Sequence, residues 1–164
     1  MLNGKDCFIN VHPKRYMRVS TFDDARYLAP RLRKCDKEEI KASHNVKPVT
    51  ALMLGVLNSD YPLSIMDGDK VVGMFGVVPT EHFASIWMLG SDDLQDISIS
   101  FLRECRGVVE MFNKKHHLLA NCVSAENKLH IKWLRWCGFK FIKLHERYGY
   151  EQKPFYEFVR LNNV

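Results

Sequence analysis

The sequence lacks a long hydrophobic run. Its longest nearly apolar stretch, Val49 to Leu57, is far shorter than the roughly 20 residues of a membrane-spanning helix. The first 13 residues mix Lys5, Asp6 and His12 with apolar side chains, which excludes the continuous apolar segment of a secretory signal peptide. We therefore expect a cytoplasmic protein that makes no membrane contact.

Cysteine is sparse, and its spacing suits neither a disulfide framework nor a metal site. The chain has an odd number of cysteines, widely spread and mostly within apolar stretches: Cys7, Cys35, Cys105, Cys122 and Cys137. This pattern predicts reduced, buried thiols. No C-x-x-C or H-x-x-x-H spacing occurs, and His116-His117 alone is a poor metal site. We expect no bound metal.

Internal repeats, low-complexity tracts and linker-like segments are also absent, so residues 1–164 are predicted to form a single domain. The net charge of +5 is unevenly distributed along this domain. Residues 101–164 contain 12 lysines and arginines against six acidic residues, whereas residues 1–100 contain 12 against 13. A basic half is typical of proteins with phosphate-rich partners, although a solvated charged surface has the same composition.

Turn residues and hydrophobic periodicity predict alternating helices and strands. Asp67-Gly68-Asp69 separates two apolar stretches and is typical of a hairpin turn, because Asp-Gly supplies positive φ angles. A long amphipathic helix is predicted by apolar residues that step by three and four: Leu94, Ile97, Phe101, Cys105, Val108 and Phe112. A strand before this helix and a strand after it form a crossover unit with two parallel strands.

The expected fold class is α/β (α+β), with a mixed central sheet flanked by helices. We expect strands at 15–20, 62–66, 70–78, 83–89, 117–123, 139–145 and 155–161. We expect helices from 21 with a break at Pro30, and at 36–43, 48–57, 94–112 and 125–137. The loop between the last two strands is expected at 147–154.

The segment Asn127 to Phe139 reads N-K-L-H-I-K-W-L-R-W-C-G-F. In the GCN5-related N-acetyltransferase (GNAT) superfamily, an Asn is followed by a small residue, an aromatic residue and Gly-Phe at fixed offsets. Those positions are occupied here by His130, Leu134, Gly138 and Phe139. With the order of elements, the chain thus resembles a GNAT-like acyl-CoA N-acyltransferase fold over nearly its whole length. A divergent bacteriophage branch of this superfamily is resembled by two segments. They are the motif N-x-x-H-I-x-x-L-x-x-x-G-F and the segment from Leu32 to Ala42. That branch includes an internal virion or morphogenesis protein of short-tailed phages.

The resemblance implies a coenzyme A site between the two parallel strands, with a Gly-rich loop around the pyrophosphate. In this chain the loop retains Gly90 but carries carboxylates at Asp92, Asp93 and Asp96. Like charges repel, so we expect these residues to oppose coenzyme binding. If acetyl-CoA does bind, Gly90 and Asn127 are the contacts that we expect.

The resemblance also implies a general acid at position 134, where leucine has no proton to give. Candidate catalytic replacements are His130 on the same helix face and Glu81 as a general base, with Glu39 as a further base. Each has a structural interpretation too, because a packed histidine and solvated carboxylates are common.

Three functional hypotheses follow. The first is a non-catalytic acetyltransferase fold used in bacteriophage assembly, located in the host cytoplasm or the particle, with phage or host proteins as partners. Trp133, Trp136, Tyr148 and Tyr150 would anchor such contacts, and the two tyrosines should protrude from their loop. The second is an acetyl-CoA-dependent N-acetyltransferase acting on a protein or small-molecule amine. The third is a DNA-associated protein whose phosphate contacts are Lys128, Lys132 and Arg135.

Overall fold

A computed structural model gives the structure of the protein and describes residues 10–12, 14–96 and 99–162. The strands are β1 (Asn10–His12), β2 (Arg15–Val19), β3 (Leu63–Asp67), β4 (Lys70–Pro79), β5 (Ala84–Gly90), β6 (Leu118–Ser124), β7 (Lys140–Tyr148) and β8 (Lys153–Leu161). The α-helices are α1 (Phe22–Leu28), α2 (Lys34–His44), α3 (Pro48–Asn58), α4 (Ile99–Lys115) and α5 (Lys128–Trp136). Two short 3₁₀ helices are η1 (Ala29–Arg31) and η2 (Asp92–Asp96).

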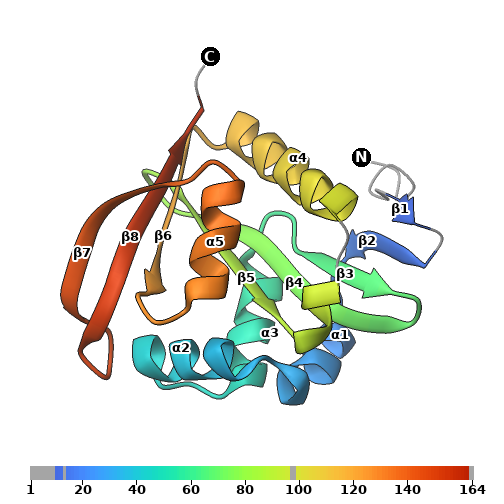
Figure 1. The fold of residues 1–164 in the computed structure, drawn as a ribbon, viewed down its shortest axis with the longest axis horizontal. Helices are drawn as coiled ribbons and strands as arrows, with labels where there is room; N and C mark the ends of the chain where they lie inside the picture. The colour runs from blue at the N-terminus through green and yellow to red at the C-terminus, as the bar shows by residue number, and fades with distance from the viewer. Residues whose placement is uncertain (1–9, 13, 97–98, 163–164) are drawn as a thin grey trace.

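The strands form one sheet in the order β1-β2-β3-β4-β5-β6-β8-β7, which confirms the predicted mixed α/β class. All neighbouring strands are antiparallel except β5 and β6, the parallel pair that the crossover predicts. These two strands pair only where Ala84 meets Leu119 and Ser85 meets Ala120. Figure 1 shows them diverging beyond that point, which leaves a split in the middle of the sheet.

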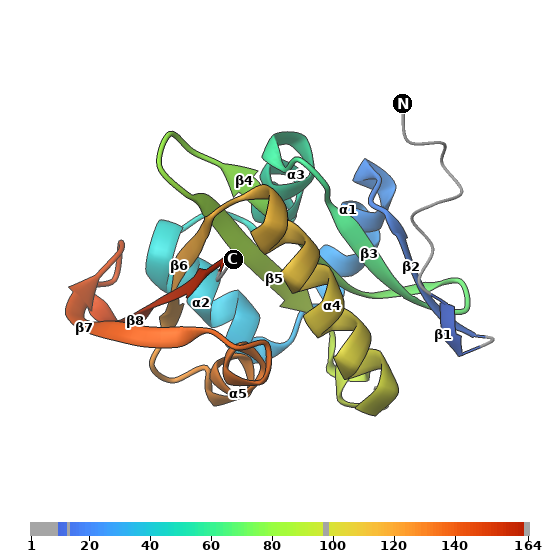
Figure 2. The ribbon, with the colours of Figure 1, turned by 90° about the horizontal axis from the view of Figure 1, so that it is seen from above.

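The helices cover both faces of the sheet (Figure 2). The larger core cluster joins α4 and α5 to one face of the sheet through residues such as Phe101, Val108 and Leu134. The second cluster joins α1, α2 and α3 to the other face and includes Leu28, Ile40 and Leu52. The split between β5 and β6 is therefore the place where the two helical layers can approach each other.

Local sequence signals account for most element boundaries. Thr21 caps α1 with a reciprocal hydrogen-bond pair to Asp24. Pro30 lies in η1, where the α-helix has already ended, as predicted. Gly68 has φ +59° in the turn between β3 and β4, so the hairpin prediction is confirmed.

The long helix begins later than its periodicity indicates. Leu94 lies in η2, and Ile97 falls outside the described residues. The reason is a close contact, because Leu94 packs where Gly90 and Gly73 leave room: a Cβ at Gly90 would lie 1.9 Å from the Leu94 side chain. The chain therefore turns inward before α4 starts.

The final loop is shorter than expected and is docked on α2. It consists of Gly149–Gln152, because β7 and β8 extend the hairpin on both sides. The backbone N–H groups of Tyr150 and Glu151 donate to the carbonyl oxygens of Ser43 and Ala42 at 3.0 and 2.9 Å. Tyr150 is 67% exposed, as predicted. The prediction for Tyr148 is wrong, because its half-buried ring packs on Phe155 with centroids 4.7 Å apart.

Candidate functional site

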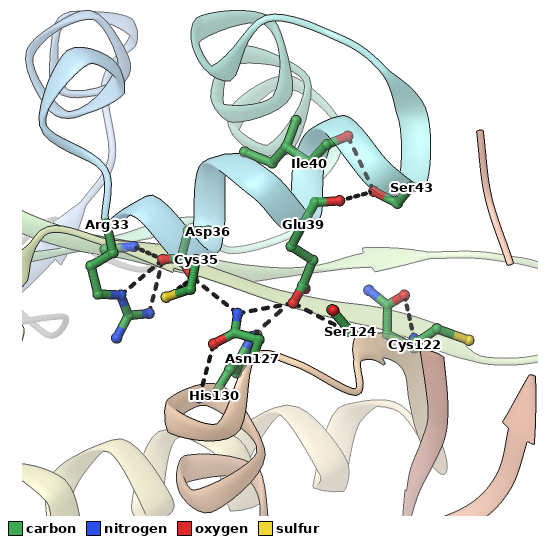
Figure 3. A network of polar contacts seen from close by, with 12 residues as sticks. Arg33, Cys35, Asp36, Glu39, Ile40, Ser43, Cys122, Ser124, Asn127 and His130 are labelled. Atoms are coloured by element: carbon green, nitrogen blue, oxygen red, sulfur yellow. Dashed lines mark hydrogen bonds and ion pairs between the residues drawn. The ribbon is translucent and has the colours of Figure 1, made fainter. Parts of the chain in front are cut away.

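A buried carboxylate, Asp36, lies in the first turn of α2 beside the end of β5 (Figure 3). Its Oδ2 accepts hydrogen bonds from Arg33 Nε and Nη2 at 3.1 and 2.8 Å and from the Gly90 backbone N–H at 2.9 Å. Its Oδ1 accepts from Asn127 Nδ2 at 3.2 Å. Asp36 is 1% exposed, and a buried charge is tolerated only where donors and an opposite charge replace water.

Glu39 lies one helical turn further along α2. Its Oε2 accepts from Asn127 Nδ2 at 2.9 Å and from the Ser124 backbone N–H at 3.2 Å. Its Oε1 lies 3.9 Å from His130 Nδ1. Burial of the carboxylate, and to a lesser degree the charge of Asp36, raises the pKa of Glu39 to about 7. Glu39 therefore exchanges a proton in the neutral pH range, which ordinary surface carboxylates do not.

Asn127 and Gly90, the residues predicted to contact a coenzyme, both belong to this network. Asn127 caps α5, because its Oδ1 accepts from the His130 backbone N–H at 3.3 Å while its Nδ2 binds the two carboxylates. The Gly90 N–H donates to Asp36, and its carbonyl accepts from the Arg33 N–H at 2.9 Å. Their coenzyme contacts stay predictions. In the structure, Gly90 at the end of β5 and Asn127 after β6 each donate a hydrogen bond to Asp36 of α2.

His130 lies on the buried side of α5, as does Leu134. Burial lowers the pKa of His130 to about 4, so its imidazole is neutral at physiological pH. The His130 ring lines the cavity described next.

A cavity of about 590 Å³ lies on the α4 and α5 side of the sheet. This volume is within the range of about 300–1,000 Å³ that is usual for small-molecule sites. Its apolar lining includes Met88, Phe101, Leu102, Leu129, Trp133 and Trp136. The charged side chains that line it are Arg33, Lys132 and Arg135, and no carboxylate of the described residues joins them. The electrostatic potential of the cavity therefore favours an anionic ligand with an apolar arm.

The carboxylates of the acidic loop do not line this cavity. Asp92, Asp93 and Asp96 are exposed on η2 and do not belong to the cavity lining, whereas Leu94 and Gln95 do. The repulsion expected from the sequence assumed carboxylates at the ligand position. Because solvent screens exposed charges, their effect on a ligand inside the cavity is weaker than that assumption requires.

The remaining predicted residues divide into two groups. Lys132 and Arg135 of the basic stripe line the cavity, whereas the exposed Lys128 does not. Glu81 lies in the turn between β4 and β5, with its side chain 88% exposed. That turn is at the opposite end of β5 from Gly90, so the structure does not bring Glu81 to His130 or to the cavity.

Sequence reasoning assigned no site role to Arg33 or Asp36. A signal was present, because Arg33, Asp36 and Glu39 follow one another at intervals of three and so share one face of a helix. Such spacing is also common on solvated helices. Only the tertiary structure shows that this face is buried against Asn127.

Substituting Glu39 with glutamine should raise stability above neutral pH. Below the ordinary pKa of 4.5 both folded and unfolded chains are protonated, but between 4.5 and about 7 only the unfolded chain ionises. Stability is therefore lost as pH rises through this window, by up to about 3 kcal/mol. Glu39→Gln keeps an acceptor oxygen for Asn127 and Ser124 and removes this loss.

Urea denaturation at about pH 4 and about pH 8 measures the effect. We expect nearly equal free energies of unfolding for Glu39→Gln and the natural chain at the acidic pH, and a more stable variant at the alkaline pH. Glu38→Gln is the matched control, because the Glu38 side chain is 58% exposed. An equal response of the two variants would contradict the assignment.

The predictions about thiols, metals and membranes can be compared with the described residues. Cys35, Cys105, Cys122 and Cys137 are free thiols, with Cys105 and Cys137 buried, while Cys7 lies outside the described residues. Within residues 10–12, 14–96 and 99–162 no cluster of potential metal ligands occurs. In the same part of the chain, no helix has both the length and the apolar character required to span a membrane.

Comparison with known proteins finds matches in structure but no match in sequence. No family model matches the chain, and no curated protein matches it either. By contrast, 247 chains of solved structures match its fold. The chain therefore shares its fold with these proteins without a detectable match in sequence.

Acetyltransferases are among the matching structures. The microcin C7 self-immunity acetyltransferase, solved with acetyl-CoA and AMP, has a TM-score of 0.70 at 12% identity and covers 96% of this chain and 98% of its own. A ribosomal L7/L12 α-N-protein acetyltransferase, solved with coenzyme A, has a TM-score of 0.69 at 11% identity, with coverages of 94% and 97%. A GNAT-family acetyltransferase from Bacillus anthracis has a TM-score of 0.64 at 14% identity, with coverages of 94% and 98%.

The chain has the GNAT acyl-CoA N-acyltransferase fold. This confirms the fold that the sequence resemblance implied. The comparisons give no support to the bacteriophage branch or to an assembly role, which stay predictions. Nothing in the described residues marks the fold as inactive, so the expectation of a non-catalytic protein has no structural support.

Proposed function

We propose that the protein is an acetyl-CoA-dependent N-acetyltransferase that acts on an amine of a protein or small molecule. The observation that carries this proposal is the cavity between α4 and α5, which is apolar in its lining and cationic in its charge. Coenzyme A has matching chemistry, because it joins a long pantetheine arm to a phosphorylated nucleotide. Two matching structures were solved with coenzyme A or acetyl-CoA, which supports the same choice of ligand.

The cavity provides separate surroundings for the two halves of such a ligand. Phe101, Leu102 and Trp133 offer apolar contact to the pantetheine arm. Lys132 and Arg135 are exposed at the cavity and can neutralise phosphate groups at a smaller desolvation cost than buried cations would. Backbone N–H groups of a Gly-rich loop are thus not required for charge neutralisation in this chain.

Glu39 is the general base of the proposed reaction. It is one side chain away from the cavity, because its Oε1 lies 3.9 Å from the His130 ring that lines the cavity. It also borders a small hollow of about 20 Å³ together with Glu38 and Glu126. The carboxylate therefore borders the α2 side of the split, and His130 lies between it and the cavity.

In the proposed transfer the amine loses one proton and the leaving thiolate gains one. As a neutral amine forms its bond to the thioester carbonyl carbon, Glu39 accepts the proton that the nitrogen loses. The carbon–sulfur bond breaks, and the sulfur leaves with the electron pair as a thiolate. That thiolate takes its proton from solvent, since Leu134 has none to donate. Neutral His130 holds its position beside Glu39 and remains a candidate for assisting the proton transfer.

Calorimetric titration with acetyl-CoA tests the proposal, and we expect micromolar affinity. Reversing the charges at the cavity with Lys132→Glu and Arg135→Glu should weaken binding by about 10-fold or more, since phosphate contacts are charge-assisted. Lys128→Glu is the matched control, because this exposed lysine is on the same helix outside the cavity lining. No binding at millimolar acetyl-CoA, or an equal loss in the Lys128 variant, would contradict the proposal.

A further inference from the structure

Arg33 is a buried cation, and the N–H donors of one guanidinium nitrogen, Nη1, are not used in hydrogen bonds to described residues. Its side chain is 7% exposed. Nε and Nη2 both donate to Asp36 Oδ2, and the backbone N–H donates to the Gly90 carbonyl. Nη1 makes no hydrogen bond to any described residue. Figure 3 shows the Arg33 guanidinium beside Asp36, with dashed lines joining it to the carboxylate.

The unused nitrogen belongs to a residue that lines the cavity. Nη1 is not sealed off from solvent, because among the described residues Trp133 Nε1 is the buried side-chain donor that lacks a partner. The Nη1 donor is therefore open to the cavity and available to a ligand there. Asp36 orients the Arg33 guanidinium by accepting from two nitrogens of that group. Asp36 is itself held by hydrogen bonds from Gly90 and Asn127. The donor direction is therefore set before any ligand binds.

The charge around Arg33 indicates which acceptor it suits. Arg33 and Asp36 form a salt bridge at 2.8 Å, so the pair is close to neutral as a unit. A phosphate dianion brought to this buried place would lose its hydration next to Asp36, which is unfavourable. A neutral carbonyl oxygen needs only a hydrogen-bond donor. The exposed cations of the cavity, Lys132 and Arg135, are better placed for phosphate.

We propose that Arg33 Nη1 donates to a carbonyl oxygen of the acyl-pantetheine arm of the cofactor and so selects and positions the acyl donor. This inference rests on the proposed function. The carbonyl is that of the thioester or that of a pantetheine amide, and both have the same hydrogen-bonding chemistry. Arg33 thereby adds a binding role to its structural role as the partner of Asp36.

Arg33→Lys is the decisive variant. Lysine keeps the positive charge beside Asp36. It lacks the forked set of guanidinium N–H donors that can bind Asp36 and a ligand in the cavity at the same time. We expect acetyl-CoA to bind about 10- to 100-fold more weakly, the usual effect of losing a charged hydrogen-bond donor. The affinity for the phosphoadenosine diphosphate portion of coenzyme A should not change. Arg31→Lys is the matched control, because Arg31 is exposed and stacks on Tyr27 outside the cavity.

S-ethyl-coenzyme A is a thioether that lacks the thioester carbonyl. It therefore distinguishes the thioester carbonyl from a pantetheine amide carbonyl as the acceptor. If Arg33→Lys weakens acetyl-CoA but not the thioether, the thioester carbonyl is the acceptor. If both ligands weaken equally while the nucleotide portion does not, a pantetheine amide is the acceptor. Unchanged acetyl-CoA affinity, or an equal loss for the nucleotide portion, overturns the inference.

Two further observations keep these outcomes separable. If the natural chain binds no acetyl-CoA, the proposed function fails and the inference fails with it, whereas normal binding by both proteins refutes the inference alone. Thermal melting checks the folding of Arg33→Lys. Should that variant unfold, the double variant Arg33→Gln with Asp36→Asn removes both charges together, and the same titrations are then read on it.

Discussion

Replacing Glu39 with glutamine should reduce kcat by about 100- to 10,000-fold, the usual contribution of a positioned general base. Glutamine retains an oxygen that can accept from Asn127 and Ser124, so the network around it is preserved. It cannot accept a proton from the attacking amine. The loss should therefore fall on kcat, while calorimetry shows unchanged acetyl-CoA affinity.

The pH dependence gives a second readout of the same variant. Because the pKa of Glu39 is raised to about 7, kcat of the natural chain should rise through neutral pH as the carboxylate ionises. This limb should be missing in Glu39→Gln. Release of free coenzyme A thiol, followed colorimetrically with a panel of peptide and polyamine acceptors, measures both effects. Glu38→Gln should keep the natural profile, and an unchanged profile in Glu39→Gln would exclude Glu39 as the base.

Phe101→Ala should destabilise the domain by about 3–5 kcal/mol, the range for truncating a buried phenylalanine. Phe101 is fully buried in the core cluster that joins α4 and α5 to the sheet, and it also lines the cavity. The loss is a large part of the total stability of a typical domain. Alanine would in addition enlarge the cavity, so acetyl-CoA affinity should fall in any folded fraction.

Guanidinium denaturation measures this loss, with Met111→Ala as the control on the same helix. Met111 is 48% exposed, so its truncation should change stability by no more than about 0.5 kcal/mol. Equal midpoints for the two variants would show that α4 packs on the sheet through a different face.

The elements of this fold could be predicted because their signals are local. Apolar spacing predicted α4, Asp-Gly predicted the hairpin around Gly68, and Pro30 predicted the end of α1. Their boundaries shifted where tertiary contacts intervened, as with Leu94 packing against Gly90. Periodicity records which residues face inward, but it does not record how closely two backbones approach.

The candidate site could be predicted only in part. By itself the sequence determined the fold class, the helix that becomes α5 and the face of it that bears His130, since helix patterns depend on residues within a few positions of one another. It did not predict the start of α5 at the Asn127 cap, because the helix was expected from Ala125. Only the tertiary structure decided that Asp36 and Glu39 meet Asn127 from about 90 residues away in the chain. The pKa of Glu39 and the unused donor of Arg33 depend on burial, and burial is a property of the packed molecule rather than of any segment.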